Sequence, residues 1–326
     1  MRRRTLVAGF AGLPLFWRIS AWAEKAAAKI GFLNSASPEA YAPMLAAFRA
    51  VLYEAGYEEG RNITLEHRWA DGHYELLPDL AAELVARKVA VIIASGSAAP
   101  AQAAKNATTK IPIIFISGSD PVRTGLVASL NRPGGNVTGI SSIFTDLLPK
   151  RVEFLYRLVP QTVRLGALVN PNYPEIEFQK RELQETAAAF HKPIDIVSAS
   201  TPVEIDRAFG ELASLGSGAL LVSNDPYFVT RGEQFAGLAA HYKIPAVYSD
   251  RSYVKAGGLM SYGPSLIEAF REAAHYTARI LNGDKPADLP VQQSTKLELV
   301  FNLKAAKALS LDVPQSIFAS ADEIVE

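Results

Sequence analysis

The chain has 326 residues, 49% of them hydrophobic and 20% charged, with a formal net charge of zero. Such a composition is typical of a globular protein and excludes wholesale disorder. The balanced charge also argues against a nucleic-acid partner, which would require a clustered excess of Lys and Arg.

The first 23 residues have the pattern of an export signal. Arg2, Arg3 and Arg4 form a basic start, and residues 6–17 are apolar but interrupted by glycine and proline. Ala21-Trp22-Ala23 supplies the small-residue pattern that precedes a cleavage site. We therefore expect a signal peptide over 1–23, of the Sec or twin-arginine type, and a periplasmic mature protein. Removal of the signal peptide leaves 29 basic and 33 acidic residues, a net charge of −4.

The sequence contains no cysteine. A lipid anchor on an N-terminal cysteine and any disulfide are thereby excluded. We expect the mature protein to be free of the membrane and stabilised by packing alone.

Unbroken apolar strands alternate with helices along the first part of the chain. The expected strands are 29–34, 62–68, 89–94 and 111–116, and the expected helices are 38–55, 76–88, 99–106 and 146–158. Strands of this kind are buried on both faces, which indicates a parallel sheet covered by helices on each side.

The second part repeats this pattern. The expected strands are 164–169, 194–197, 218–222, 244–248 and 257–262, with helices at 175–190, 202–214, 230–241 and 266–281. Residues 291–302 alternate like an edge strand, and a short helix follows at 303–309.

The two halves also resemble each other in sequence. Residues 29–35 correspond to 164–170, residues 91–97 to 219–225, and residues 110–115 to 243–248. These three segments occur in the same order, separated by spacers of helix length. Two similar α/β lobes in one chain commonly face each other across a cleft, and such clefts bind small molecules.

Polar residues follow the strands of both halves, where ligands bind in open parallel sheets. Our candidates are Asn34, Ser35, Ser95, Gly96, Ser97, Ala98, Ser117, Asp120, Asn170, Tyr173, Asn224, Asp225, Tyr227 and Asp250. Small residues before a helix, as in 95–98, expose backbone N–H groups that suit a carboxylate. Asp120 or Asp225 could hold an ammonium group, and Tyr41, Tyr173 and Tyr227 could stack on a ring. For any one Ser, Asn or Asp, the alternative is a helix cap or a turn.

Motifs for catalysis are missing from the sequence. There is no cysteine nucleophile, G-x-S-x-G elbow, Walker A loop or H-E-x-x-H sequence. His67, Asp71, His73 and Glu75 could together ligate a metal, but a solvated loop explains them better. We therefore expect neither an enzyme nor a cofactor or metal.

Four sequence blocks give the chain a family resemblance. They are 119–122 (SDPV) followed by 125–127 (GLV), 132–139 (RPGGNVTG), 256–263 (AGGLMSYG) and 285–290 (KPADLP). With these blocks the chain resembles the ABC-transporter substrate-binding proteins of the tryptophan/tyrosine-binding (TrpX-like) type, over essentially everything after the signal.

The resemblance implies an α/β fold of the type I periplasmic binding proteins. Two doubly wound, Rossmann-like lobes with parallel sheets would be joined by a three-strand hinge, as in a Venus flytrap. Lobe 1 would comprise 28–143 and 257–286, and lobe 2 would comprise 144–256 and 287–326. The hinge would lie near 140–146, 255–258 and 286–291.

The resemblance also implies a function. A monomeric receptor would capture a small carboxylate-bearing ligand, with an aromatic amino acid or related aromatic acid favoured, and deliver it to an ABC permease in the inner membrane. The turn at 95–98 would hold the carboxylate, although Ala98 and Ala99 stand where a threonine is expected. A sensor subunit of a signalling receptor, or less readily an enzyme on this fold, remains an alternative.

Overall fold

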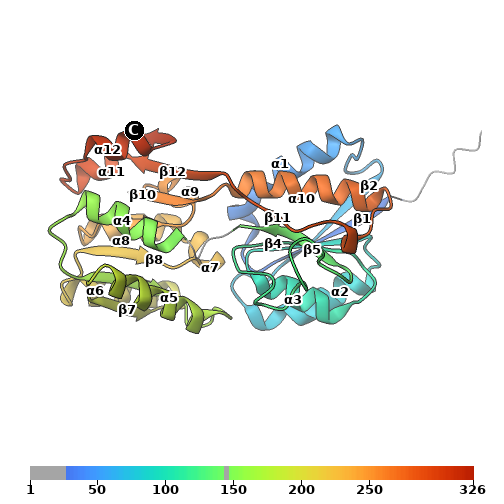
Figure 1. Ribbon diagram of the computed structural model, residues 1–326, viewed down its shortest axis with the longest axis horizontal. Helices are drawn as coiled ribbons and strands as arrows, with labels where there is room; N and C mark the ends of the chain where they lie inside the picture. The colour runs from blue at the N-terminus through green and yellow to red at the C-terminus, as the bar shows by residue number, and fades with distance from the viewer. Residues whose placement is uncertain (1–26, 143–146) are drawn as a thin grey trace, which may run out of the picture.

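The computed structural model describes residues 27–142 and 147–326. The predicted signal peptide and most of the first predicted hinge segment therefore lie outside the described residues. The chain forms two lobes side by side, each with a central sheet (Figure 1).

The sheet of the first lobe is entirely parallel, in the order β11-β5-β4-β3-β1-β2. Its strands are β1 (Ala28–Asn34), β2 (Ile63–Trp69), β3 (Val91–Ser95), β4 (Ile113–Ser117), β5 (Val137–Ser141) and β11 (Gln292–Gln293). Strands β3, β4 and β5 are fully buried, which explains their continuous apolar sequences.

Helices cover both faces of this sheet. They are α1 (Pro38–Glu54), the short η1 (Tyr74–Leu76), α2 (Leu77–Ala86), α3 (Ala98–Ala107), α10 (Leu266–Leu281) and the short η3 (Pro286–Asp288). Helices α1 and α10 pack against one face, where Phe48 and Phe270 are buried together with Phe32 of β1. Helices α2 and α3 pack against the other face.

The second sheet has the order β13-β12-β10-β9-β8-β6-β7, and only the β10–β12 pair is antiparallel among the described strands. Its strands are β6 (Leu165–Val169), β7 (Ile194–Ser198), β8 (Ala219–Val222), β9 (Ala246–Tyr248), β10 (Met260–Pro264), β12 (Leu297–Asn302) and β13 (Glu323–Val325).

Helices also cover both faces of the second sheet. One face is covered by α4 (Leu148–Leu158), α5 (Ile176–Ala189), α11 (Leu303–Ala308) and α12 (Gln315–Ser320). The other is covered by α6 (Pro202–Ser214), α7 (Pro226–Val229), α8 (Gly232–His241) and α9 (Arg251–Lys255). Each lobe thus has two hydrophobic cores, one on either side of its sheet.

The predicted duplication has a direct counterpart in the topology. The strand order β2-β1-β3-β4-β5 of the first lobe recurs as β7-β6-β8-β9-β10 in the second. In both sheets the strand order reverses beside the first strand, and the carboxyl ends there form the crevice in which such folds bind ligands. Asn34 ends β1, and Asn170 follows β6 at the matching position.

Two of the predicted crossings lie elsewhere in the structure. The sequence predicts a return to lobe 1 at residue 257, but β10 pairs with β9 and β12 of the second sheet, and the chain crosses only after Pro264. The predicted final return to lobe 2 at residue 287 is likewise too early, because β11 still pairs with β5 and the crossing follows Gln293. The predicted single strand over 291–302 is therefore two strands in different sheets.

The described residues contain neither a membrane-spanning helix nor a metal-binding cluster. Over 27–142 and 147–326, no helix is both long and apolar enough to cross a membrane. The same residues contain no group of three or more His, Cys, Asp or Glu side chains placed to hold a metal ion.

Candidate functional site

A cavity lies between the lobes at the carboxyl ends of both sheets. It encloses about 420 Å³, including space open to solvent. The first lobe contributes Tyr41, Gly96, Ile116, Ser117, Gly118, Ser142, Leu266 and Phe270, and the second contributes Asn224, Pro226, Val229 and Asp250. We call it the interlobe cavity.

The first-lobe wall is built around the start of α3. Ser97 caps this helix, because its Oγ accepts the N–H of Ala99 at 3.3 Å. Asn34 Nδ2 donates to Ser95 Oγ at 2.8 Å. The buried Ser35 Oγ has no hydrogen-bond partner among the described residues. A helix start beside an unsatisfied hydroxyl can receive a carboxylate.

Gly96 is required at this wall. Its φ of +100° lies in the region that favours glycine, and an added Cβ would lie 2.4 Å from Ser35 Oγ. The backbone of the turn can therefore approach Ser35 and Asn34 closely.

Aromatic rings form another side of the interlobe cavity. The ring centroid of Tyr41 lies 5.9 Å from those of Trp69 and Phe270. Burial, aided by the negative charge of Asp250, raises the pKa of Tyr41, so its hydroxyl stays protonated and can donate. This side can pack against the ring of a ligand while offering a hydroxyl group.

Asp225 lies behind the second-lobe wall, next to the lining residues Asn224 and Pro226. It is completely buried, and its carboxylate accepts from the N–H of Phe228 at 3.1 Å and from Asn170 Nδ2 at 3.2 Å. Burial raises its pKa to about 6, although these hydrogen bonds oppose the shift. Nearby, Asp250 lines the interlobe cavity and caps α9 by accepting from the N–H of Ser252 at 2.8 Å.

Direct contacts hold the two lobes together around the cavity. Tyr74 Oη of the first lobe donates to Asp225 Oδ2 at 3.0 Å, and its ring meets Tyr173 edge-on at 6.0 Å. Arg123 of the first lobe pairs with Glu175 of the second at 2.6 Å, and its guanidinium lies 3.8 Å from the Phe178 ring centroid. In this structure the two lobes therefore contact each other directly beside the cavity.

Replacing Tyr74 by phenylalanine should shift the protein towards open forms. The substitution removes one interlobe hydrogen bond, which contributes about 1 kcal/mol, and the free protein should become larger in small-angle scattering. Tyr57→Phe is the control, because the Tyr57 hydroxyl donates to Asn282 within the first lobe. Equal dimensions for the two variants would contradict the prediction.

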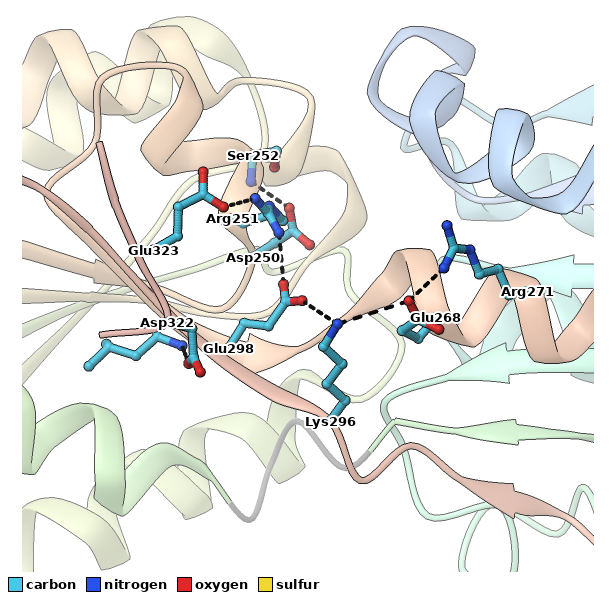
Figure 2. Close-up of polar contacts among 10 residues, drawn as sticks. Asp250, Arg251, Ser252, Glu268, Arg271, Lys296, Glu298, Asp322 and Glu323 are labelled. Carbon is cyan, nitrogen blue, oxygen red and sulfur yellow. Dashed lines mark hydrogen bonds and ion pairs between the residues drawn. The ribbon is translucent and has the colours of Figure 1, made fainter. Parts of the chain in front are cut away.

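Charged residues also connect the lobes beside the third crossing (Figure 2). Lys296 Nζ lies 3.6 Å from Glu298 of β12 and 4.0 Å from Glu268 of α10. Arg251 extends the network within the second lobe by pairing with Glu298 at 3.0 Å. Lys296 is largely exposed, so its ion pairs stabilise this arrangement by less than about 1 kcal/mol.

The sequence matches the model of a known protein family. The family model described as "ABC transporter substrate binding protein" matches residues 29–325. The chain belongs to this family. It is also 30% identical, over 264 residues, to the tyrosine-binding protein of Clostridioides difficile, covering 81% of this chain and 75% of that protein. The predicted family resemblance is thus confirmed.

Solved structures confirm the predicted type I periplasmic-binding fold. A conserved domain protein from Vibrio cholerae superposes with a TM-score of 0.83 at 27% identity, covering 91% of this chain and 99% of that one. An ABC domain from Streptococcus pneumoniae in complex with L-Trp gives 0.82 at 24% identity, covering 92% and 100%. The ligand-free, open structure of a substrate-binding protein from Clostridium difficile gives 0.66 at 26% identity, covering 91% and 99%.

The substrate-binding protein brings most of the predicted site residues together. Gly96, Ser117, Asn224 and Asp250 line the interlobe cavity. The remaining buried candidates lie directly behind this lining or at the contact between the lobes: Asn34, Ser35, Ser95, Ser97, Ala98, Asn170, Tyr173, Asp225 and Tyr227.

Asp120 is the exception among the predicted residues. It is exposed, and its Oδ1 accepts from the N–H groups of Val122 and Arg123 in the following turn. Asp120 thus stabilises a turn, which was the alternative to a ligand-binding role. It does not line the interlobe cavity.

Some residues of the candidate site and of the contact between the lobes are missing from the prediction. Ser142 follows β5, so applying the strand-end rule to this fifth strand would have found it. Tyr74 lies in η1 and Phe270 within α10, away from any strand end. The sequence gives no signal for these two residues, because their position depends on tertiary packing.

Proposed function

We propose that the protein is the exported receptor of an ABC importer. It captures a small carboxylate-bearing solute, an aromatic amino acid or a related aromatic acid, in the interlobe cavity and presents it to a permease of the inner membrane. The observation that carries this proposal is a cavity closed by both lobes, with a helix start, an aromatic side and an aspartate around it. The names of its relatives, a tyrosine-binding protein and a domain in complex with L-Trp, favour the same ligand class.

Each wall has a role in this proposal. The start of α3, with Ser35, Gly96 and Ser97, receives the carboxylate. Tyr41 and Phe270 pack against the ring. Asp250 of the second lobe accepts the ammonium group of an amino acid.

Binding is coupled to closure of the lobes. Because the walls that hold carboxylate and ammonium belong to different lobes, one solute satisfies both only when the lobes are together. The superposition scores support this coupling. At similar identity and coverage, the protein matches the structure with L-Trp at 0.82 and the open, ligand-free structure at 0.66.

Titration calorimetry with L-tyrosine and L-tryptophan tests the proposal. Asp250→Asn keeps an oxygen for the cap of α9 but loses the charge facing the cavity. Its affinity should fall tenfold or more, about 1.4 kcal/mol. Asp120→Asn is the matched control, because Asp120 also caps a turn but lies outside the cavity, and its affinity should equal that of the wild type. An unchanged affinity of the Asp250 variant would contradict the role of Asp250, and a wild type that binds none of L-tyrosine, L-tryptophan and benzoate would contradict the proposal.

A further inference from the structure

A second cavity adjoins the interlobe cavity on the α4–α5 side of the second lobe. It shares the lining residues Gly118 and Asn224 with the interlobe cavity, so the two cavities are neighbours. Leu148, Tyr173 and Phe178 give it apolar walls, and Arg151, Gln179 and Ser223 give it polar groups. We call this space the Arg151 pocket.

Arg151 is a buried cation without a matching anion among the described residues. Its side chain lies in the first turn of α4, and the residue is only 4% exposed. Nε donates to the carbonyl of Tyr262 at 2.7 Å, but Nη2 has no partner, and no carboxylate among the described residues pairs with the guanidinium. Burial lowers the pKa of Arg151 to about 10, which still leaves it charged at neutral pH.

A buried unpaired charge is costly, by several kcal/mol in folded proteins. Two further buried atoms of the same lining, Gln179 Oε1 and Ser223 Oγ, also have no partner among the described residues. Of these three unsatisfied atoms, Arg151 Nη2 and Ser223 Oγ can donate to an acidic group, whereas Gln179 Oε1 can only accept a hydrogen bond.

The carboxylates of the lining are already engaged. Glu175 pairs with Arg123 at 2.6 Å and accepts from Ser119 Oγ. Glu182 likewise has an interaction of its own. Among the described residues neither carboxylate forms an ion pair with Arg151, so the guanidinium can attract an anionic group of a ligand.

We propose that the Arg151 pocket binds an acidic group at the far end of the solute, so that the preferred ligands are small aromatic acids with two acidic groups. The inference rests on the proposed function, because the first acidic group must lie at the start of α3 in the interlobe cavity. The guanidinium of Arg151 receives the second group, Ser223 Oγ donates to it, and Phe178 and Leu148 pack beside the ring.

Matched titrations with benzene-1,4-dicarboxylate and benzoate test this assignment. The wild type should bind the diacid at least tenfold more tightly than the monoacid. Arg151→Met, which keeps the length but not the charge, should abolish that preference. Arg157→Met on the same helix is the control, because Arg157 is partly exposed and paired with Glu153; it should keep the preference.

Thermal unfolding of the ligand-free variants separates a binding role from a structural one. Arg151→Met should melt at the same temperature as the wild type or higher, since it removes an unpaired buried charge. If this variant does not fold, Arg151→Gln, which can still donate to the Tyr262 carbonyl, takes its place.

Three results would overturn the assignment: equal affinity of the wild type for both acids, no binding of either acid, or an unchanged preference in Arg151→Met. A protein that binds L-tyrosine and loses it in Asp250→Asn, yet shows no preference for the diacid, would refute the Arg151 pocket alone. The proposed function would then stand.

Discussion

The substitution Gly72→Ala should hold the two lobes apart and weaken solute binding tenfold or more, about 1.4 kcal/mol. Gly72 of the first lobe packs against the ring of Tyr227 in the second, and an added Cβ would lie 2.8 Å from Tyr227 Cδ2 and 3.3 Å from its Cβ. The ring is buried, so it cannot move aside without disturbing α7. Separation of the lobes relieves the overlap between the added Cβ and the Tyr227 ring at a lower cost in free energy.

Gly60→Ala separates this effect from backbone strain. Both glycines lie in the first lobe at almost the same φ, +82° for Gly72 and +85° for Gly60, but nothing lies within 4 Å of a Cβ at Gly60. Each substitution should cost about 1 kcal/mol of stability through the strained backbone. In calorimetry with L-tryptophan and in small-angle scattering, only Gly72→Ala should bind weakly and appear open. Identical behaviour of the two variants would show that Gly72 plays no part in closure.

The contribution of Asp225 to the stability of the protein should fall as the pH rises from about 4 to about 7. Burial raises the pKa of this carboxyl from 3.8 to about 6 in the folded chain, so folding favours the protonated form. The contribution of protonated Asp225 to the free energy of unfolding is therefore fully present below about pH 4. It is lost as the pH rises through about 6. A shift of this size corresponds to about 3 kcal/mol.

Urea unfolding across this pH range should be compared with that of Asp225→Asn. Other carboxylates contribute opposite slopes, since the pKa values of Glu153 and Glu204 are lowered, but they contribute equally to both proteins. The difference in unfolding free energy between wild type and variant should thus report Asp225 alone. A difference that does not change between pH 4 and 7 would refute the assigned pKa shift.

The fold of each lobe could be read from the sequence because its strands are locally distinctive. Apolar segments such as 91–95 and 113–117 are strands buried on both faces, and the helices between them carry apolar residues at helical spacing. The repeat of three segments also predicted the shared strand order. The sheet to which each late strand belongs could not be read in this way. Gly257 and Gly258 suggest a hinge, yet β10 joins the second sheet through pairing with β12, some 40 residues later in the chain.

The residues of the candidate site likewise fall into those that the sequence predicts and those that only the tertiary structure shows. Strand ends meet at one edge of a parallel sheet, so residues such as Gly96, Ser117 and Asn224 could be identified from their position after a strand. Side chains that reach the site from helices could not. Arg151 lies on α4 within the segment 148–154 (LPKRVEF), which has no distinctive motif. Only the packing of α4 in the folded lobe shows that its charge is buried and has no partner among the described residues.

The interleaving of the lobes has a consequence for biosynthesis. The first lobe needs α10 to cover α1 and Phe32, and the second needs β12 beside β10. As the chain leaves the ribosome, the first lobe cannot complete its hydrophobic core until about residue 281 has been made, and the second cannot complete its sheet until about residue 302. Nearly the whole polypeptide must therefore be synthesised before either half is finished, so neither lobe can reach its final stability while the chain is still growing.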